Sequence, residues 1–366
     1  MAASISSTLV NTLAQQAGFA LGGIAAVPRV DSDVGREERT RFEQWIAGGA
    51  AGEMEYLNRR NDEGELVRSS LHAVFPWAKS VIVCAANYNG GQPRSIDPAA
   101  EGTGWIARYA QTGAEGTRPS DYHKVLLKRL QVLEGTLKQH AGAFESRCYV
   151  DTGPVVERVY ARYAGIGWTG KNTCILNQQL GSWIFLGVIL TSIEAQPEEL
   201  PQLAADRCGS CTRCIDACPT DALTPYKMDA TRCIAYLTIE KRGSIPEELR
   251  EGIGRQVFGC DICQDVCPWN AKAPASNDAE LAPREALVNP ALDWLAAMDE
   301  AEFGRWFYGS PVKRAKFHGF RRNVAIAMGN SGRDEFLQRL GEWAESEDKT
   351  VREAASWAVQ KLNALR

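Results

Sequence analysis

Cysteine spacing constrains this chain more than any other feature, because eight of its 11 cysteines lie between residues 208 and 267. The first run reads C-x2-C-x2-C-x3-C-P and ends at Pro219. With this spacing, three thiolates bind one [4Fe-4S] cluster and the fourth reaches a second cluster. A further run, C-x2-C-x3-C-P, ends at Pro268. The sequence therefore predicts a module that folds around two iron–sulfur clusters and transfers electrons.

The two runs are related by a shift of 49 residues. The shift superposes three cysteines, whereas Cys208 falls on Val257, so the second run lacks one ligand. Cys233 lies between the runs and is the natural replacement. Each x3 step carries its thiolate away from its own cluster, and the proline that follows turns the backbone. We therefore assign one cluster to Cys208, Cys211, Cys214 and Cys267, and the other to Cys218, Cys233, Cys260 and Cys263.

Zinc and disulfides are the alternatives for these cysteines. Zinc sites prefer paired C-x2-4-C units with long separations, not three cysteines at successive x2 steps. Disulfides are less favoured still, because no charged start followed by an apolar stretch and a cleavage site directs the chain to an oxidising compartment. We expect a cytoplasmic protein. The remaining cysteines stand in apolar or strand-like segments, where buried structural thiols are the default; they are Cys84, Cys148 and Cys174.

Length and charge limit the other possibilities. The chain has 366 residues, enough for two or three domains, with an ordinary 45% hydrophobic and 23% charged composition. No apolar run reaches the 18 or so residues of a membrane span. The formal net charge is -4, which gives no global reason to expect a nucleic-acid partner. Such a partner would need a local basic patch.

Residues 1–191 show the mixed pattern of an α+β domain. Short apolar runs predict buried strands at 80–85, 147–150 and 182–190. Residues 121–140 have the spacing of an amphipathic helix with apolar and basic faces. This region is long enough to form its own core.

The rest of the chain divides into a cysteine module at 192–275 and a helical region at 276–366. Residues 192–207 carry prolines and acids without a period, which indicates a linker. Similar alternation of alanine and aliphatic residues in the last region suggests one or two HEAT-like helix pairs. The expected helices span 291–307, 311–329, 333–346 and 349–364.

A glycine-rich segment at 165–171 superficially matches two nucleotide-binding motifs. The phosphate loop needs a hydroxyl after its lysine, but Asn172 stands there. Both motifs also need a strand before the loop and a helix after it, whereas residues 154–164 read as helix and those from Cys174 onward as strand. We therefore do not expect NAD or ATP here, although the loop could approach another flat or bulky ligand.

The segment 149–154, Tyr-Val-Asp-Thr-Gly-Pro, ends a short apolar strand in an acid before a helix that begins at proline. An acid at a strand tip is well placed to face a cleft; alternatively, Asp151 forms an Asx turn or caps the helix. Arg158 and Arg162 follow at helical spacing. They could form a basic stripe, or they could lie with Glu157 on a solvated helix face. His123 could line a site or be an ordinary surface histidine.

A basic stretch near the C-terminus alternates cations with aromatic rings. Cations contact phosphates, and rings can stack on unpaired bases. The alternative is a basic amphipathic helix whose phenylalanines belong to the core. The cations are Lys313, Arg314, Lys316, Arg321 and Arg322, interleaved with Phe317, His318 and Phe320.

As a set, these residues resemble the cobalamin-dependent epoxyqueuosine reductases, which are related to reductive dehalogenases. The similarity spans nearly the whole chain in order, and the combination is far more specific than any one motif. The matching segments are 53–57 (EMEYL), 108–110 (RYA), 121–123 (DYH), 149–154 (YVDTGP), 167–173 (GWTGKNT), the complete cysteine pattern and 321–323 (RRN).

The resemblance implies an enzyme that converts epoxyqueuosine to queuosine at the wobble position of tRNA. It also implies a nitroreductase-like cobalamin-binding domain at 1–191, a ferredoxin-like domain with two [4Fe-4S] clusters at 192–275 and a tRNA-contacting helical domain at 276–366. The electrons would come from an external donor, and we expect a monomer that is not bound to a membrane.

The resemblance also assigns residues. Asp151 would be the proton donor above the cobalt, and we expect its pKa to be raised by burial beside the cofactor. The implied cobalamin neighbours are Arg59, Asp151, Lys171 and the backbone near Val257 and Phe258. The basic stretch would supply tRNA contacts from Lys313, Arg314, Arg321 and Arg322. Because the motif D-x-H-x-x-G is absent, we expect no protein histidine as the lower cobalt ligand.

Two other functions remain open at this point. A small-molecule reductase of the cobalamin-dependent dehalogenase type would use the clusters and the cobalamin, but it would leave the basic helical end unexplained. A ferredoxin-type electron carrier would use the clusters alone and would leave the large N-terminal region without a role.

Overall fold

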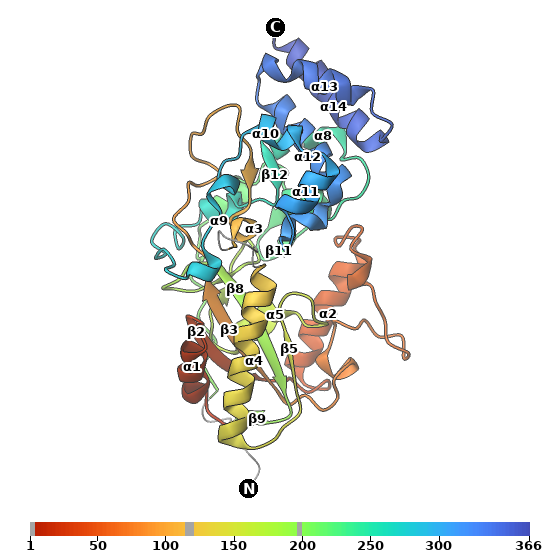
Figure 1. Cartoon of the computed structure of the whole chain (residues 1–366). Helices are drawn as coiled ribbons and strands as arrows, with labels where there is room; N and C mark the ends of the chain where they lie inside the picture. Colours follow the sequence, from red (N-terminus) through yellow and green to blue (C-terminus); the bar gives the residue numbers. More distant parts are fainter. Residues whose placement is uncertain (1–3, 114–120, 196–199) are drawn as a thin grey trace. The chain divides into compact units, whose positions relative to one another are not determined.

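The structure, a computed structural model, describes residues 4–113, 121–195 and 200–366 (Figure 1). The chain forms two compact units, each assembled from three separate segments. Unit 1 contains residues 1–89, 122–211 and 268–276, and unit 2 contains residues 90–121, 212–267 and 277–366.

Unit 1 is built on a four-stranded antiparallel sheet with the strand order β2-β3-β8-β5. The three strands predicted from apolar runs are confirmed as β3, β5 and β8, because buried central strands need continuous apolar sequence. The strands are β2 (Leu21–Ala26), β3 (Ser80–Asn87), β5 (Ser146–Tyr149) and β8 (Ile184–Thr191).

Helices cover both faces of this sheet. Helices α1 (Ser7–Gln16) and α4 (Tyr122–Ala141) pack on one face, and α5 (Glu157–Tyr163) packs on the other. The predicted helix at 121–140 is therefore confirmed as α4. The short α5 approaches β2 so closely that a Cβ at Gly23 would lie 2.1 Å from the Ala164 carbonyl oxygen.

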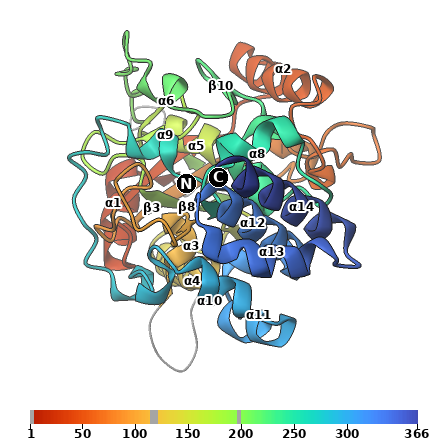
Figure 2. The same ribbon diagram turned by 90° about the horizontal axis from the view of Figure 1, so that it is seen from above.

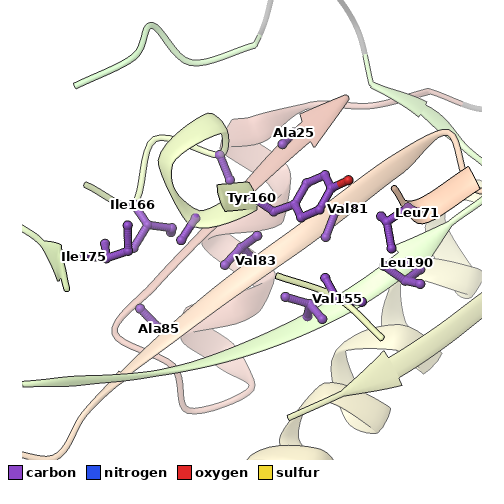
Figure 3. Close-up of a cluster of buried hydrophobic side chains, with 13 residues drawn as sticks. Ala25, Leu71, Val81, Val83, Ala85, Val155, Tyr160, Ile166, Ile175 and Leu190 are labelled. Atoms are coloured by element: carbon purple, nitrogen blue, oxygen red, sulfur yellow. The ribbon is translucent and has the colours of Figure 1, made fainter. Parts of the chain in front are cut away.

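Figure 3 shows the core beneath α5. Side chains at alternate positions of β3, Val81 and Val83, face this core, as the two-residue period of a strand requires. Val155, just before α5, and Tyr160 within it belong to the same buried cluster. This packing fixes the start of α5 against the sheet.

The other elements of unit 1 are short. Strands β1 (Ser4–Ile5) and β9 (Glu194–Ala195) pair in parallel, so part of the predicted linker at 192–207 is ordered, while 196–199 lie outside the described residues. A hairpin joins β6 (Trp168–Thr169) to β7 (Ile175–Leu176). The remaining helices are α2 (Asp33–Ala47), η1 (Glu55–Leu57) and η2 (Leu71–Ala73).

Unit 2 contains the cysteine-rich segment from residue 212 onward, while Cys208 and Cys211 belong to unit 1. In this segment the sequence repeat becomes a structural repeat. The four-residue helices α6 (Arg213–Asp216) and α9 (Ile262–Asp265) are related by the same shift of 49 residues and pack against each other. Between them lie β10 (Leu223–Thr224), β11 (Lys227–Met228), η4 (Ala230–Arg232), α7 (Ile234–Ile239), α8 (Glu247–Ile253) and β12 (Gln256–Phe258).

An earlier segment of the chain also belongs to unit 2. Strand β4 (Trp105–Ile106), followed by helix α3 (Arg108–Gln111), pairs in parallel with β12. The predicted domain boundary at residue 191 did not anticipate the pairing of β4 with β12. This pairing joins segments about 150 residues apart and leaves no local pattern in the sequence.

The C-terminal part of unit 2 is helical, as predicted, with more interruptions than the sequence suggested. Helices α12 and α14 pack together, and α13 packs on α14 (Figure 2). Helix α12 also contacts β12, α7 and α8, so residues 212–267 of the cysteine-rich segment share one unit with the C-terminal helices. The elements are η5 (Ala279–Leu281), η6 (Glu285–Leu287), α10 (Leu292–Ala297), α11 (Glu300–Trp306), η7 (Pro311–Ala315), α12 (Lys316–Asn330), η8 (Asp334–Phe336), α13 (Leu337–Ala344) and α14 (Lys349–Ala364).

Within the described ranges, no helix combines the length and the apolar character that crossing a bilayer requires.

Candidate active site

The loop between β5 and α5 holds Asp151 in a strained turn. Its φ is +58°, and the Thr152 N–H donates to the Val150 carbonyl oxygen at 2.6 Å, which closes a three-residue turn around the acid. Left-handed backbone at a non-glycine residue costs about 1–3 kcal/mol and is frequent at functional sites. A Cβ at Gly153 would lie 2.5 Å from the Tyr149 ring, so the turn requires glycine there.

Two residues from the first turn of α4 contact the Asp151 carboxyl. The Tyr122 hydroxyl donates to Oδ2 at 3.2 Å, and His123 Nε2 lies 3.7 Å from the same oxygen. Tyr122 is itself fixed, because its ring stacks on Phe185 with centroids 4.1 Å apart. The Asp151 side chain remains 69% exposed, so it is held by neighbours and still accessible to a substrate.

The pKa of Asp151 is lowered, mainly by interaction with the His123 side chain. The positive charge of His123, the Tyr122 hydroxyl and Arg158 act in the same direction, and burial opposes them. The prediction of a raised pKa is therefore wrong for this structure. These partners stabilise the carboxylate form more than the surroundings destabilise it.

Glu157, the first residue of α5, has the opposite shift. Burial raises its pKa to about 7, and the nearby negative charge of Asp151 adds to this, whereas a hydrogen bond from its own backbone N–H and the charges of Arg68 and Arg158 lower it. Its Oε1 is buried, and among the residues that the structure describes it has no hydrogen-bond partner. From the sequence, Glu157 was expected on a solvated helix face, so its buried carboxyl oxygen was not predicted. The apolar residues directly before it were the available signal for burial.

The two arginines on α5 are engaged with protein groups and do not form a basic stripe. Arg158 Nη1 donates to the Thr173 carbonyl oxygen at 3.0 Å. Arg162 Nη2 lies 2.7 Å from Glu38 Oε1 and donates also to the Tyr163 hydroxyl. Their charges therefore act locally, on this loop and on α2.

The glycine-rich segment forms the β6–β7 hairpin. The Gly170 N–H donates to the Cys174 carbonyl oxygen, and the Thr173 N–H donates to the Gly170 carbonyl oxygen, each at 2.8 Å. No helix follows the loop, so the expectation that it is not a nucleotide-binding motif agrees with the structure. Lys171, at the turn, donates to the carbonyl oxygens of Gly209 at 2.6 Å and Cys211 at 3.1 Å.

The other predicted cobalamin neighbours have different surroundings. Arg59 is exposed in unit 1. Val257 and Phe258 lie in β12 of unit 2, and both side chains are fully buried. Asn323 Nδ2 donates to the Val257 carbonyl oxygen at 2.9 Å, and the Ala107 N–H donates to that of Phe258. A cofactor could therefore not reach these two residues through their side chains.

The structure brings part of the cysteine pattern together. Burial raises the pKa of Cys260 well above its usual value, and the charges of Cys233 and Cys218 add to this effect, so these three thiols are neighbours. Cys218 Sγ also accepts a hydrogen bond from the Ala222 N–H at 3.4 Å. In the described part of the chain, none of the 11 cysteines is joined in a disulfide.

The backbone repeats itself around the two short helices. The Ile215 N–H donates to the Thr212 carbonyl oxygen, and 49 residues later the Gln264 N–H donates to the Asp261 carbonyl oxygen, each at 2.8 Å. Over the described ranges, no three His, Cys, Asp or Glu side chains are grouped as ligands of a single metal ion. The division of the cysteines into two cluster sites therefore rests on their spacing.

The prediction that Arg322 contacts tRNA is wrong, because its side chain is buried. It is only 1% exposed. Its guanidinium donates to the carbonyl oxygens of Leu237 at 2.6 Å, Lys241 at 2.8 Å and Gly243 at 2.7 Å, and to Asn323 Oδ1 at 3.0 Å. A guanidinium with this many protein acceptors inside unit 2 joins α12 to α7 and to the segment after it, and does not meet a phosphate.

The other predicted tRNA contacts are nearer the surface. Lys313 and Arg314 are exposed, and Arg314 forms a bidentate pair with Glu240 at about 3.0 Å. Arg321 is partly buried, with its guanidinium 4.5 Å from the centroid of the Trp343 ring.

Comparison with known proteins gives two family matches. Residues 207–270 match a family described as "4Fe-4S double cluster binding domain". Residues 68–152, which include Asp151, match a family described as "Epoxyqueuosine reductase QueG, DUF1730".

Similar proteins cover nearly the whole chain. An epoxyqueuosine reductase of Xanthomonas campestris is 38% identical over 96% of this chain and 94% of its own length. A solved epoxyqueuosine reductase in complex with an epoxyqueuosine-modified tRNA-Tyr stem loop has a TM-score of 0.79, with 27% identity over 96% of this chain and 88% of that one. The Bacillus subtilis enzyme, solved with an aspartate catalytic loop swung out of the active site, has a TM-score of 0.76, with 27% identity and the same coverage of both chains.

Proposed function

This chain belongs to the epoxyqueuosine reductase family, and we propose that Asp151 is the proton donor with which it reduces epoxyqueuosine in tRNA to queuosine. One observation carries the assignment. A carboxyl that is 69% exposed stands in a strained turn and is oriented by Tyr122 and His123 from another element. A solved relative has a catalytic loop that carries an aspartate, which supports the same role here.

The reaction sets what this site must supply. Loss of the epoxide oxygen as water leaves an alkene and consumes two electrons and two protons. Two [4Fe-4S] clusters carry electrons singly, and cobalamin, when bound, supplies a reducing cobalt centre at the substrate. The chain's own residues must orient the substrate, deliver protons to the departing oxygen and limit competing reactions with water.

The residues present fit these groups. For the clusters we propose the ligand sets assigned from the spacing, supported by the neighbouring thiols of Cys218, Cys233 and Cys260. For cobalamin we propose Arg59, Asp151 and Lys171 of unit 1, with main-chain contacts from Val257 and Phe258. Exposed Arg59 and Asp151 offer charged groups to a polar cofactor, and Lys171 holds carbonyl groups of the first cysteine run.

We further infer that the helical end of the chain contacts the tRNA. Lys313 and Arg314 are exposed cations, and Arg321 presents a guanidinium stacked on Trp343. Cations of this kind position the phosphate backbone, and aromatic rings allow stacking on bases. The complex of a relative with a tRNA stem loop supports this partner. We also propose that helices α12 to α14 form a HEAT-like arrangement of helix pairs.

The decisive experiment compares the parent chain with Asp151→Asn, both loaded with clusters and cobalamin. Asparagine preserves the shape and the Tyr122 contact but cannot donate a carboxylic proton. We expect the loss of one oxygen from epoxyqueuosine, followed by nucleoside mass spectrometry, to slow by about 100-fold to 10,000-fold. Glu145→Gln, an exposed substitution in the same unit, is the control. An Asp151→Asn protein with normal cofactors that reacts at the parent rate contradicts the assignment.

A further inference from the structure

Lys171 lies at the turn of the β6–β7 hairpin, where its ammonium group contacts the backbone of the first cysteine run. The hairpin and residues 208–211 both belong to unit 1. We propose that Lys171 positions this run and raises the reduction potential of the cluster that the run binds. The inference rests on the proposed function and its ligand sets. It concerns the supply of electrons, which the assignment of Asp151 as proton donor does not address.

Two hydrogen bonds join Lys171 to the cysteine run. Its Nζ donates to the Gly209 carbonyl oxygen at 2.6 Å and to the Cys211 carbonyl oxygen at 3.1 Å. The Cys211 N–H donates to the Cys208 carbonyl oxygen at 3.0 Å and closes a turn between the two cysteines. Gly209 within this turn has a φ of +50°, in the left-handed region that favours glycine. The ammonium group therefore holds a turn whose two ends are both proposed cluster ligands.

Contacts within unit 1 fix the hairpin that carries Lys171. The next residue, Asn172, is only 3% exposed. Thr173 has a φ of +65°, and its carbonyl oxygen accepts a hydrogen bond from Arg158 of α5. Ile175, the first residue of β7, belongs to the buried core beneath α5 (Figure 3). The position of the ammonium group is thus set by the sheet and by α5, and not by the cysteine run alone.

The charge of Lys171 favours the reduced state of the cluster. A [4Fe-4S] cluster accepts one electron at a time, here from an external donor, and each electron adds one negative charge. A cation bonded to the backbone of a ligand stabilises the more negative state, because opposite charges attract. Lys171 is partly exposed, so solvent and salt weaken this attraction without changing its sign.

An acid at the other end of the turn provides an internal comparison. Asp206 Oδ1 accepts a hydrogen bond from the Cys208 N–H at 2.8 Å. Its carboxylate should favour the oxidised cluster, and by less than Lys171 favours the reduced one, because Asp206 is exposed. The two side chains hold the same turn and carry opposite charges. Their removal should therefore move the potential in opposite directions, which a purely structural role of both residues would not do.

Redox titration of the full chain, followed by EPR, measures the midpoint potential of each cluster. Lys171→Gln removes the charge and keeps a hydrogen-bond donor. We expect the ratio of reduced to oxidised cluster at a fixed potential to fall by about tenfold for one cluster, a shift of about 59 mV in a one-electron couple. Lys171→Arg keeps the charge and should stay close to the parent. Lys79→Gln, which removes an exposed lysine elsewhere in unit 1, is the matched control and should change neither midpoint.

Asp206→Asn is the second variant of the test. It keeps an acceptor for the Cys208 N–H and should raise the midpoint that Lys171→Gln lowers. Titration with and without cobalamin separates an effect on the cluster from an effect on the cofactor. If Lys171→Gln loses the iron of one cluster, the positioning role stands, and Asp206→Asn then decides the electrostatic one.

Three results overturn the inference. They are a midpoint that Lys171→Gln leaves unchanged or raises, an equal shift in Lys171→Gln and Lys171→Arg, and a midpoint that Asp206→Asn does not raise. The proposed function fails in a different way. A parent chain with two titrating clusters and bound cobalamin that converts no epoxyqueuosine overturns that function, and the midpoints still report the effect of Lys171.

Discussion

At the scale of single residues, two carboxyls only six positions apart around the loop after β5 have pKa values shifted in opposite directions. The sequence predicted where Asp151 stands, because an acid that ends an apolar strand before Gly-Pro is a local signal. It did not predict the direction of the pKa shift. That direction depends on Tyr122 and His123, which arrive from α4 about thirty residues earlier in the chain.

The same two acids give opposite pH dependences of stability. The raised pKa of Glu157 means that the folded chain binds more protons than the unfolded one between pH 4.5 and about 7, so stability falls as pH rises through this window. The lowered pKa of Asp151 contributes stability that is present above its unfolded pKa and is lost as pH falls through the folded one.

We therefore expect Glu157→Gln to have a larger free energy of unfolding than the parent above about pH 7, with the difference shrinking towards acidic pH. Urea unfolding at several pH values measures this difference. Asp151→Asn should show the opposite trend, with its deficit disappearing in acid. Parallel stability curves for the parent and Glu157→Gln would show that this carboxyl titrates normally.

At the scale of elements, helix α12 combines a structural arginine with exposed cations just before it. Neighbouring positions in a basic stretch look alike in sequence, and only packing against the segment after α7 identifies Arg322 as buried. By contrast, the break between α10 and α11 was predictable. Asp299 and Glu302 form a capping box, a pattern visible in the sequence as D-x-x-E. The predicted helix at 291–307 should have been divided there.

Substitution of Arg322 by methionine should destabilise unit 2. The change keeps much of the apolar volume and leaves buried carbonyl oxygens without donors, so we expect a loss of about 2–4 kcal/mol in the free energy of unfolding. Arg339→Met, on the exposed face of α13, should change it by less than about 0.5 kcal/mol. Equal effects of the two substitutions in chemical denaturation would contradict the structural role of Arg322.

The exposed cations before α12 should instead act on tRNA affinity. We expect Lys313→Ala to weaken binding of a tRNA stem loop and to reduce the slope of log affinity against log salt by about one. Thermal stability should hardly change. Lys79→Ala, an exposed lysine of unit 1, serves as the control. An unchanged salt slope in titrations of Lys313→Ala would remove this residue from the tRNA contact.

At the scale of the whole molecule, the cysteine pattern was the most predictable feature and the division into units the least. Ligand spacing is a local constraint, and the helices α6 and α9 reproduce its repeat residue for residue. The pairing of β4 with β12 and the joining of residues 268–276 to unit 1 are long-range contacts between short, unpatterned segments. Sequence periodicity carries no information about such contacts.

The assignment of Cys233 as the replacement ligand predicts a loss from one cluster only. We expect Cys233→Ser to lower the iron content from about eight to about four per chain and to alter one set of EPR signals. Cys148→Ser is the matched control, because this thiol contacts Glu134 and stands outside the pattern. Full iron content and an unchanged EPR spectrum in Cys233→Ser would assign the fourth ligand elsewhere.

Unit 1 is assembled from three separate segments, so it can be completed only after its last segment, residues 268–276, has been synthesised. Residues 268–276 contribute contacts such as that of Asn270 Nδ2 with the Ser182 hydroxyl at 2.8 Å. A ribosome adds about 5–20 residues per second, so unit 1 remains incomplete for some tens of seconds after its first strand emerges. Every cysteine of the cluster pattern leaves the ribosome before that moment. Iron and sulfide can therefore meet the nascent cysteines before the last segment of unit 1 is in place.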